Sequence, residues 1–562
     1  MIKIKESIPI KLSGNSSLFI SFDKNFDKIL PIIKSYIPAI YSSKNKVWEL
    51  STIYLVDILE NLYYYDDIEL ELLEEEVKEE NNLSKEEIIE FKYAPYKHQI
   101  EAINFLINNK KALLLDSMGV GKSLEIMYTA EVLHKRGLIE HCLIVCGVDS
   151  LRSNWKNEIL KFSKESVLVL GERINKNNKI VYDSIPKRVE QLKNKINEFF
   201  IVTNISSLRD DNIINAIKTG PNKIEMIAVD EIHKIATKTS QQGNNLLKLK
   251  SDYQIAATGS PITNSPLSIY IPLSWTDIDK SNLTNYKNLY CEMEQGPFHN
   301  QQIIGYKNLL FLQDEIHKHS IRRTFNQIRD NMPKKTIEYE LVEMSNEHRK
   351  FYEDIKNGVK EEADKIELNI NNLLALTTRL RQATSIPSLL TSQNISSSKI
   401  ERCVDIAESV LNNKEKLVIF CNFIESANEL YKLLSKYNPI LGTGQQEDNY
   451  ILEGIEKFRN SNNYNLLICT HSKMGTGFSF PECHYALMLD TPFTYSQFSQ
   501  SCDRIYRITS EQPVYIKVLA CKDTYDERVR NIIENKKDLG DFLIDKKDIN
   551  IINELKNSII NL

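Results

Sequence analysis

The stretch LLLDSMGVGKS ends in Gly121-Lys122-Ser123, which has the residue types and spacing of a phosphate-binding loop. Glycines let the backbone curl, a lysine reaches the outer phosphates and a serine hydroxyl is a magnesium ligand. The general pattern also has a glycine five residues before Gly121, where this chain has Asp116. On these residues alone, a glycine turn that only joins a strand to a helix remains an alternative to a nucleotide site.

A second group of candidate residues is the acidic pair Asp230-Glu231, at the end of the apolar run IEMIAVDEIHK. At the carboxyl end of a parallel strand, an aspartate holds magnesium and an adjacent glutamate orients the attacking water. The alternative is a helix start whose acidic residues stabilise the positive end of the helix.

Two arginines, Arg504 and Arg507, lie three residues apart in QSCDRIYRITS. On a helix or turn this spacing brings two guanidinium groups together, and such a pair clamps a transferring phosphoryl group. For an isolated pair, surface salt bridges with Asp503 and its neighbours are the alternative.

The elements that must position these residues follow a regular pattern. Apolar strands alternate with amphipathic helices, which predicts parallel sheets covered by helices. The strands expected in a first block are ALLLD, CLIVCG, VLVLG, FIVTNI, MIAVD and QIAATGS, and those in a second block are KLVIFCNF, NLLICTHS, HYALMLD and VYIKVLA. Between the blocks, from Ile278 to about Leu390, the pattern is helical. The expected fold is therefore α/β, with two lobes and helical material between them.

Composition narrows the class of protein. The 562 residues are 42% hydrophobic and 26% charged, as in ordinary globular chains with room for several domains. The net charge is −5, so a DNA-binding surface would be a local patch. The nine cysteines lack CxxC pairs, no export signal is seen, and no apolar run approaches the ~20 residues of a membrane span. We expect a soluble, intracellular protein without structural zinc or membrane contact.

The loop DSMGVGKS resembles the Asp-Glu-Met-Gly-Leu-Gly-Lys-Thr loop of the Swi/Snf family of DNA-translocating ATPases, within superfamily-two helicases. In that family an acid commonly stands in place of the first glycine, as Asp116 does here. Ser117 departs from the usual glutamate, and Ser123 replaces threonine but keeps the hydroxyl.

Further segments resemble the motifs of this family in the family's order. In the first lobe they are YAPYKHQIEAINFL, a segment containing Trp155, IVTNISSLRD, DEIH and AATGSPITNSPLSIYIPLSW. Between the lobes, segments around Arg322 and Arg381 resemble two helical segments that distinguish Swi/Snf motors from simpler helicases. In the second lobe, ICTHSKMGTGFSF and QSCDRIYRITS resemble the glycine-bearing motif and the arginine motif, whose final Gly-Gln is replaced by Thr509-Ser510.

The resemblance implies two RecA-like parallel-sheet lobes and a division of the chain. Residues 1–88 form a small N-terminal α+β module, faintly resembling the HARP-like module of annealing helicases, with an acidic linker. The lobes are residues 89–278 and 399–545, residues 279–398 are helical insertions, and residues 546–562 form a tail. A capping domain that packs on the motor is the alternative for the N-terminal module.

The resemblance also implies a role for individual residues. ATP would be bound by Gln99, which reads adenine, and by Met118, Gly119, Val120, Gly121, Lys122 and Ser123. Magnesium would be bound by Ser123 and Asp230, and catalysis would use Lys122, Asp230, Glu231, Arg504 and Arg507. Nucleic acid would be contacted by Trp155, Ser207, Thr470 and Ser472, and coupling would use Thr258, Gly259, Gly475 and Gly477, with Pro261 and Asn264 in the same motif.

The expected function is that of a DNA-dependent ATPase, a monomeric motor that tracks along duplex or branched DNA through backbone contacts, using ATP and Mg²⁺. Its work would be fork or junction remodelling or protein displacement. An RNA helicase and a nucleotide-binding scaffold that no longer hydrolyses are the alternatives. Abundant Asn, Ile and Lys point to an AT-rich microbial or viral genome, and thus to the cytoplasm of a microbe or of a virus-infected microbial cell.

Overall fold

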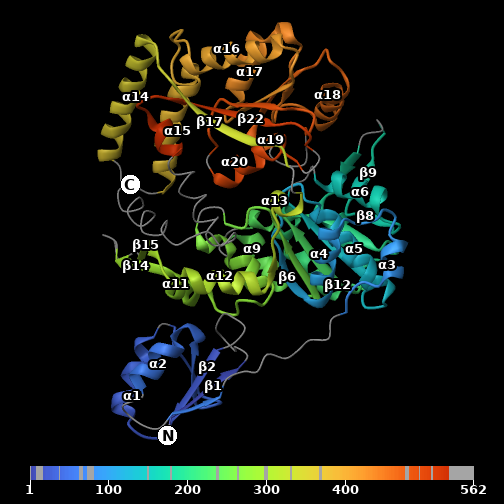
Figure 1. Cartoon of the computed structure of the whole chain (residues 1–562), viewed down its shortest axis with the longest axis vertical. Helices are drawn as coiled ribbons and strands as arrows, with labels where there is room; N and C mark the ends of the chain where they lie inside the picture. The colour runs from blue at the N-terminus through green and yellow to red at the C-terminus, as the bar shows by residue number, and fades with distance from the viewer. Residues whose placement is uncertain are drawn as a thin grey trace. The chain divides into compact units, whose positions relative to one another are not determined.

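The computed structural model describes residues 2–7, 17–36, 38–62, 68–71, 81–147, 151–176, 180–235, 240–262, 265–295, 301–329, 332–365, 370–474, 480–492, 494–507 and 510–530. Contacts divide the chain into two units (Figure 1). The first unit holds the described residues of Met1–Ser117 and Gly121–Arg323, and the second unit holds those of Met118–Val120 and Thr324–Lys537. In the part of the chain that is described, no helix is long and apolar enough to cross a membrane.

The N-terminal module is a five-stranded sheet with two helices. Its strand order is β3-β4-β2-β1-β5, with β1 and β5 parallel and the other pairs antiparallel. The elements are β1 (Ile2–Ser7), β2 (Ser17–Phe22), α1 (Phe26–Ser35), β3 (Ile40–Ser42), β4 (Val47–Ser51), α2 (Leu55–Leu62) and β5 (Ile68–Glu71). Alternate residues of β1 and β2 are buried against Ile29 and Ile33 of α1, because side chains alternate across a strand. The expected α+β module is confirmed, and its HARP-like character stays a prediction.

A seven-stranded sheet forms the centre of the first unit. Its order is β16-β6-β13-β12-β7-β11-β8, and every pair is parallel. The strands are β6 (Lys111–Leu114), β7 (His141–Cys146), β8 (Val167–Val169), β11 (Phe200–Asn204), β12 (Ile224–Asp230), β13 (Tyr253–Ala257) and β16 (Ser320–Ile321). All six strands predicted for the first block are present. The two-residue strand β16 was not predicted.

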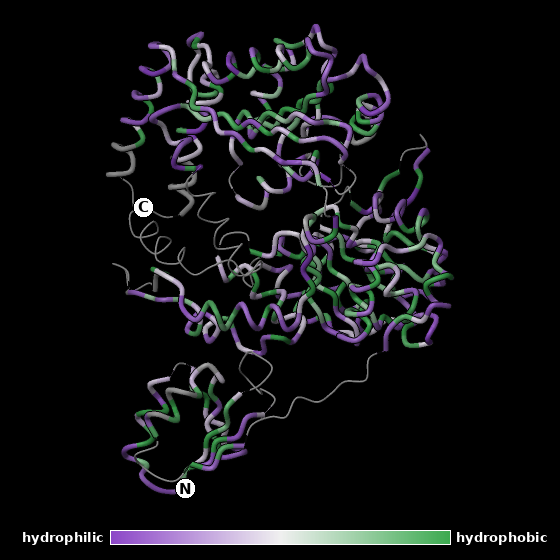
Figure 2. The backbone as a smooth tube through the Cα atoms, in the orientation of Figure 1, coloured by the Kyte–Doolittle hydropathy of each residue, from purple (hydrophilic) through white to green (hydrophobic). Residues whose placement is uncertain are grey.

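Helices cover both faces of this sheet (Figure 1). The helices of the first unit that follow the N-terminal module are α3 (Lys85–Glu90), α4 (Lys97–Asn108), α5 (Lys122–Lys135), α6 (Leu151–Phe162), α7 (Ile185–Lys193), α8 (Asp211–Thr219), α9 (Gln241–Lys248), α10 (Tyr270–Trp275), α11 (Leu283–Tyr290) and α12 (Leu309–Lys318). Leu143 and Val145 of β7 belong to one apolar cluster, and Ile144 belongs to another. Two covered faces explain why these strands are continuous apolar runs, coloured as hydrophobic in Figure 2.

Two antiparallel hairpins extend the first unit outside its sheet. They are β9 (Glu172–Ile174) with β10 (Ile180–Tyr182), and β14 (Cys291–Gln295) with β15 (Gln301–Tyr306). The second hairpin lies in a stretch that was predicted to be helical. Its residues alternate too weakly in hydropathy to be separated from the helices around them.

The boundaries of the first lobe, which the sequence placed at residues 89 and 278, lie elsewhere at both ends. Asn82 and the helix α3 already pack on it, since Arg136 donates two hydrogen bonds to Glu87, at 2.8 and 2.9 Å. At the other end, β16 pairs with β6. The insertion expected over residues 279–398 is therefore divided, and its residues up to Arg323 belong to the first unit.

The second unit contains a six-stranded sheet in which every pair is parallel, in the order β17-β22-β21-β18-β20-β19. Its strands are β17 (Lys335–Val342), β18 (Leu417–Cys421), β19 (Ile440–Gly442), β20 (Leu466–Thr470), β21 (Tyr485–Met488) and β22 (Val514–Cys521). Its helices are α13 (Phe325–Ile328), α14 (Asn346–Lys365), α15 (Ile370–Ser385), α16 (Ser398–Asn412), α17 (Ile424–Leu433), α18 (Asp448–Asn460), α19 (His471–Met474) and α20 (Tyr495–Cys502). The four predicted strands are present, whereas β17 and β19 were missed.

The missed strand β17 moves the start of the second unit. It pairs with β22 along eight residues, from Lys335 opposite Val514 to Val342 opposite Cys521. The second sheet thus begins well before residue 399, where the sequence placed it. The predicted tail, residues 546–562, lies outside the described residues.

Candidate nucleotide site

The register of the first sheet brings the predicted site residues to one edge. Asp230, the last residue of β12, lies opposite Ala257 of β13, and Ala257 lies opposite Leu114 of β6. Three groups of predicted residues therefore follow the carboxyl ends of three adjacent parallel strands. They are the acidic pair after β12, the predicted coupling residue Thr258 after β13, and the phosphate-binding loop (residues 115–121) after β6. Ligands of open α/β sheets bind at this end.

The phosphate-binding loop has the backbone of an anion site. Gly119 and Gly121 have φ values of 81° and 117°, in a region that favours glycine. Helix α5 begins directly after Gly121, and no side chain caps its first turn. Uncapped N–H groups at a helix start bind anions, so the loop fits a phosphate.

Lys122 is held at this loop by main-chain carbonyls. Its Nζ donates to the carbonyl of Asp116 at 2.8 Å and to that of Ser117 at 3.3 Å. The predicted magnesium ligand Ser123 is the next residue in α5 and is half-buried. The lysine and the hydroxyl therefore leave the same helix start.

Gln99, the predicted adenine reader, lies against the same loop. Its Oε1 accepts a hydrogen bond from the N–H of Tyr96 at 2.9 Å, which fixes the side chain at the start of α4. Its Nε2 packs on Gly121 so closely that a Cβ at Gly121 would lie 2.4 Å from it. Any side chain at position 121 would displace Gln99.

The acidic pair is held from two sides. Trp155 Nε1 donates to Asp230 Oδ2 at 3.1 Å. Glu231 has φ 54°, a value that a residue other than glycine adopts at a cost of about 1–3 kcal/mol and that is concentrated at functional sites. Its carboxylate is 3.2 Å from Nδ1 of His233. The same Nδ1 lies 2.8 Å from Thr258 Oγ1, so His233 joins the acidic pair to the coupling motif.

The two carboxylates of the pair have opposite tendencies to bind a proton. Burial and the neighbouring charge of Glu231 raise the pKa of Asp230 to about 7. Burial acts in the same sense on Glu231, but the hydrogen bond with His233 and the charges of His233 and Lys122 outweigh it and lower the pKa of Glu231 to about 2. Glu231 is therefore ionised at neutral pH, as a group that orients water must be.

Most of the residues predicted to contact nucleic acid are buried. Trp155, Ser207 and Thr470 are 3%, 1% and 2% exposed, so little of their side-chain surface is open to a nucleic acid, and their contact with it stays a prediction. Trp155 supports Asp230 instead, and Ser207 Oγ accepts a hydrogen bond from Arg188 Nη1 at 3.0 Å. Ser472 alone of the four is exposed. An aromatic or hydroxyl residue in a motif does not by itself indicate exposure.

A buried charge cluster contains Asp116, the residue that stands where the general phosphate-binding pattern has a glycine. Asp116 is fully buried, and Arg323 contacts both of its carboxylate oxygens and donates to Glu125 Oε1 at 2.9 Å. Burial and the charge of Asp116 raise the pKa of Glu125 to about 8. The sequence showed an unusual feature, an acid where a glycine is usual. It did not show which arginine would balance the charge of that acid.

The predicted arginines lie in the second unit. Arg504 is 6% exposed, and its carbonyl accepts a hydrogen bond from Phe480 N at 2.6 Å. Arg507 N donates to Ser510 Oγ at 2.9 Å. Ser510, which departs from the family's pattern, thus shapes the turn that carries Arg507. Thr509, Asn264, Gly475 and Gly477 lie outside the described residues, and Gly259 O is 3.5 Å from Arg322 Nη1.

Sequence reasoning also missed a buried network in the second unit. Lys399 is 1% exposed and forms ion pairs with Asp490 at 2.9 Å and Asp526 at 2.8 Å. Thr384 of α15 donates to Asp526 at 3.0 Å, and Ser385 donates to Asp490. The network ties α15 to the carboxyl ends of the strands.

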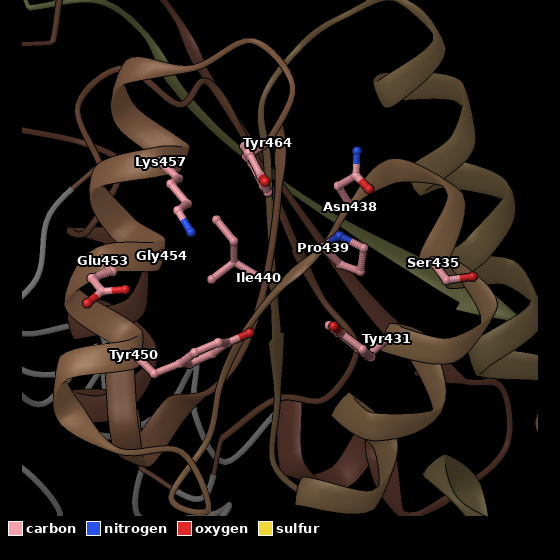
Figure 3. Close-up of a pocket in the computed structure, with 10 residues that line it drawn as sticks. All are labelled: Tyr431, Ser435, Asn438, Pro439, Ile440, Tyr450, Glu453, Gly454, Lys457 and Tyr464. Atoms are coloured by element: carbon pink, nitrogen blue, oxygen red, sulfur yellow. The ribbon is translucent and has the colours of Figure 1, made fainter.

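A separate pocket of about 250 Å³ lies beside the edge strand β19 and contains none of the predicted site residues (Figure 3). Three tyrosines line it together with Glu453 and Lys457, namely Tyr431, Tyr450 and Tyr464. Lys457 Nζ is 5.9 Å from the ring of Tyr464. The pocket is therefore distinct from the nucleotide site.

Comparison with known proteins agrees with this geometry. Residues 98–389 match the SNF2-related domain, and residues 398–509 match the helicase conserved C-terminal domain. An uncharacterised ATP-dependent helicase of Mycoplasma genitalium is 25% identical over 459 residues, which are 79% of this chain and 41% of that protein. One of Mycoplasma pneumoniae is 24% identical over 80% of this chain and 42% of its own length.

The chain thus spans less than half the length of these relatives. A solved SWI2/SNF2 ATPase core of Sulfolobus solfataricus, in complex with dsDNA, is 21% identical, with 82% of this chain and 94% of that chain covered and a TM-score of 0.36. Because the SNF2-related domain covers more than half of the chain and its motif residues meet at one sheet edge, the chain belongs to the SNF2-related family.

Proposed function

We propose that this chain is a motor that hydrolyses ATP when it binds duplex DNA and uses that hydrolysis to move along the duplex. The observation that carries the proposal is the alignment of Asp230, Ala257 and Leu114 across three parallel strands. In that alignment the glycine loop and Glu231, whose pKa is lowered to about 2, follow neighbouring strands at one sheet edge, and the charge of Lys122 acts on both Asp230 and Glu231.

ATP would be bound by the uncapped start of α5, with Lys122 at the outer phosphates and Gln99 at the base. Ser123 and Asp230 offer the hydroxyl and carboxylate oxygens that Mg²⁺ prefers, and Mg²⁺ commonly uses one or two such ligands together with substrate phosphates. The bound ion would neutralise charge on the phosphates. It would also favour the ionised form of Asp230, whose pKa is raised to about 7.

In this proposal Glu231 orients the attacking water, and Arg504 and Arg507 supply positive charge to the transferring phosphoryl group. An arginine in this role contributes roughly 10³–10⁵ in rate. His233 transmits the state of the acidic pair to Thr258, since it contacts both.

DNA would be bound through its backbone, because gripping phosphates suits movement along any sequence. Support comes from the family and from the relatives named as ATP-dependent helicases. We further propose that the chain acts as a monomer on duplex or branched DNA. The buried side chains of Trp155, Ser207 and Thr470 are not part of this proposal.

Displacement of a third strand from a DNA triplex tests movement along the duplex directly. The protein should release the third strand in the presence of ATP and Mg²⁺, and Glu231→Gln should bind ATP without releasing it. Release that needs no ATP, or no release by protein that turns over ATP on duplex DNA, would contradict the proposed movement.

A further inference from the structure

Arg323 contacts the phosphate-binding loop, the helix that follows it and the segment that carries Gln99. Its main-chain N–H donates to Asp116 Oδ1 at 2.8 Å, its Nε donates to the same oxygen at 3.1 Å, and its Nη2 donates to Asp116 Oδ2. Nη2 also donates to Glu125 of α5, and Nη1 donates to the carbonyl of His98, the residue before Gln99. One guanidinium group therefore joins the loop, the helix after it and the segment of the predicted adenine reader.

The contacts continue from Arg323 to Lys122. The carbonyl of Arg323 accepts a hydrogen bond from Ser117 N at 3.0 Å, so Arg323 holds both Asp116 and Ser117. The carbonyls of these two residues are the acceptors for Lys122 Nζ, at 2.8 and 3.3 Å. A shift of Arg323 would therefore move the acceptors that position the phosphate-binding lysine.

Arg323 also lies where the chain passes from the first unit to the second. Arg323 is the last described residue of the first unit, and the chain continues with Thr324 in the second unit. It lies two residues after the end of β16, whose pairing with β6 keeps it beside the loop. The point at which the chain leaves the first unit is thus hydrogen-bonded to the nucleotide site.

We propose that Arg323 is a positioning residue for ATP, which sets the phosphate-binding loop through Asp116 and ties the connection between the two units to the occupancy of that loop. The inference rests on the proposed ATPase function. It assigns Asp116 a role in place of the usual glycine, as the acceptor that links Lys122 to Arg323. Arginine is required because its fork of donors satisfies Asp116, Glu125 and the carbonyl of His98 at once, whereas lysine has one nitrogen.

The test compares nucleotide binding with folding stability in full-length variants. We would measure the dissociation constant of a fluorescent ATP analogue, and KM and kcat for ATP. The proteins are wild type, Arg323→Gln, Arg323→Lys and Asp116→Asn, each kept at urea concentrations well below its own unfolding midpoint. We expect Arg323→Gln to weaken binding at least tenfold and to raise KM more than it lowers kcat.

Arg323→Lys separates a positioning role from a structural one. It keeps the positive charge beside Asp116, so we expect it to recover most of the urea midpoint lost in Arg323→Gln but little of the ATP affinity. Recovery of midpoint and affinity in equal proportion would overturn the proposal, as would wild-type affinity in Arg323→Gln.

The matched control is Arg136→Gln. Arg136 also donates two hydrogen bonds to a carboxylate of the first unit, that of Glu87, but touches none of the nucleotide-site residues. It should leave ATP affinity unchanged, and a loss equal to that of Arg323→Gln would overturn the proposal. Absence of ATP binding by the folded wild type would instead contradict the proposed function, which keeps the two failures distinct.

Discussion

His233 Nδ1 lies 2.8 Å from Thr258 Oγ1, so the segment after β12 that carries the acidic pair is hydrogen-bonded to the segment after β13. Thr258 is 1% exposed, and its Oγ1 also accepts a hydrogen bond from Ser260 N at 3.1 Å. A buried hydroxyl with two such partners responds to movement of either segment. The proposed route from Glu231 to the coupling motif runs through this contact.

Thr258→Val should uncouple hydrolysis from DNA binding. Valine keeps the shape of threonine but removes the hydroxyl that contacts His233 and accepts a hydrogen bond from Ser260 N, and an unsatisfied buried polar group costs about 1–3 kcal/mol. We expect DNA-stimulated kcat to fall about tenfold, the equivalent of about 1.4 kcal/mol, with the ATP dissociation constant little changed. Steady-state kinetics with and without duplex DNA measure the effect.

Thr276→Val is the control for that substitution. Thr276, the residue after α10, is equally buried and donates to Pro272 O of that helix at 2.7 Å. It should lower stability but leave stimulation by DNA intact. Equal loss of stimulation in both variants would contradict the coupling role of Thr258.

Trp155→Phe should weaken magnesium binding rather than DNA binding. Phenylalanine cannot donate to Asp230 Oδ2, and loss of a hydrogen bond that orients a metal ligand typically costs 10–100-fold in metal affinity. We expect the Mg²⁺ concentration for half-maximal ATP hydrolysis to rise about tenfold, and the half-saturating DNA concentration to stay constant.

Trp275→Phe provides the comparison, since Trp275 is fully buried in the same unit and its Nε1 donates to Leu249 O at 2.8 Å. Its Mg²⁺ requirement should match that of the wild type. A change in DNA affinity with an unchanged Mg²⁺ requirement in Trp155→Phe would restore the original prediction that Trp155 contacts DNA.

Lys399→Met should strongly destabilise the second unit. It leaves Asp490 and Asp526 buried without their cation, and removal of one partner from a buried ion pair typically costs about 3–5 kcal/mol. Urea unfolding of the full chain measures the loss. Lys436→Met, which removes a solvent-exposed pair with Glu408, should change the unfolding midpoint little, and equal effects would contradict the account of the network.

Mild acid should destabilise the second unit through His471. Burial lowers the pKa of His471 from an ordinary value of 6.5 to about 4, and the charge of Arg381 adds a smaller effect in the same direction. The hydrogen bond to the carbonyl of Asp490 acts in the opposite direction but does not outweigh burial. Because the unfolded chain binds the proton first, this stability is full above pH 6.5 and is lost as the pH falls towards 4. The loss by pH 5 is about 2 kcal/mol.

Unfolding in urea at pH 7.5 and pH 5 measures that loss. His471→Gln should be less stable at pH 7.5 but should show a smaller difference between the two pH values. A pH dependence as steep in His471→Gln as in the wild type would assign the acid sensitivity to other groups.

The sequence predicted the sheets better than their edges, for a physical reason. Central strands such as β7 are buried on both faces and form apolar runs, whereas β17 is an edge strand with a charged, half-exposed pattern that resembles a helix or a loop. The ends of the first unit depend on pairings between distant segments, such as β16 with β6, which local patterns do not contain.

Candidate site residues could be predicted where their pattern involves neighbours in the sequence. They could not be predicted where a residue acts with a partner far away in the sequence. Lys122 and the Asp230-Glu231 pair are recognised by local spacing. Asp116 and Arg323 are 207 residues apart, and only the fold pairs them. The burial of Trp155 was not predicted, because a motif position says nothing of burial.

Steady-state ATP hydrolysis by the full chain, measured alone and with duplex DNA, single-stranded DNA or RNA, tests the central claim most directly. Lys122→Ala and Glu231→Gln serve as inactive controls. The account predicts strong stimulation by duplex DNA that both variants abolish. Greater stimulation by RNA, or ATP binding without turnover under any of these conditions, would contradict it and favour an RNA helicase or a nucleotide-binding scaffold.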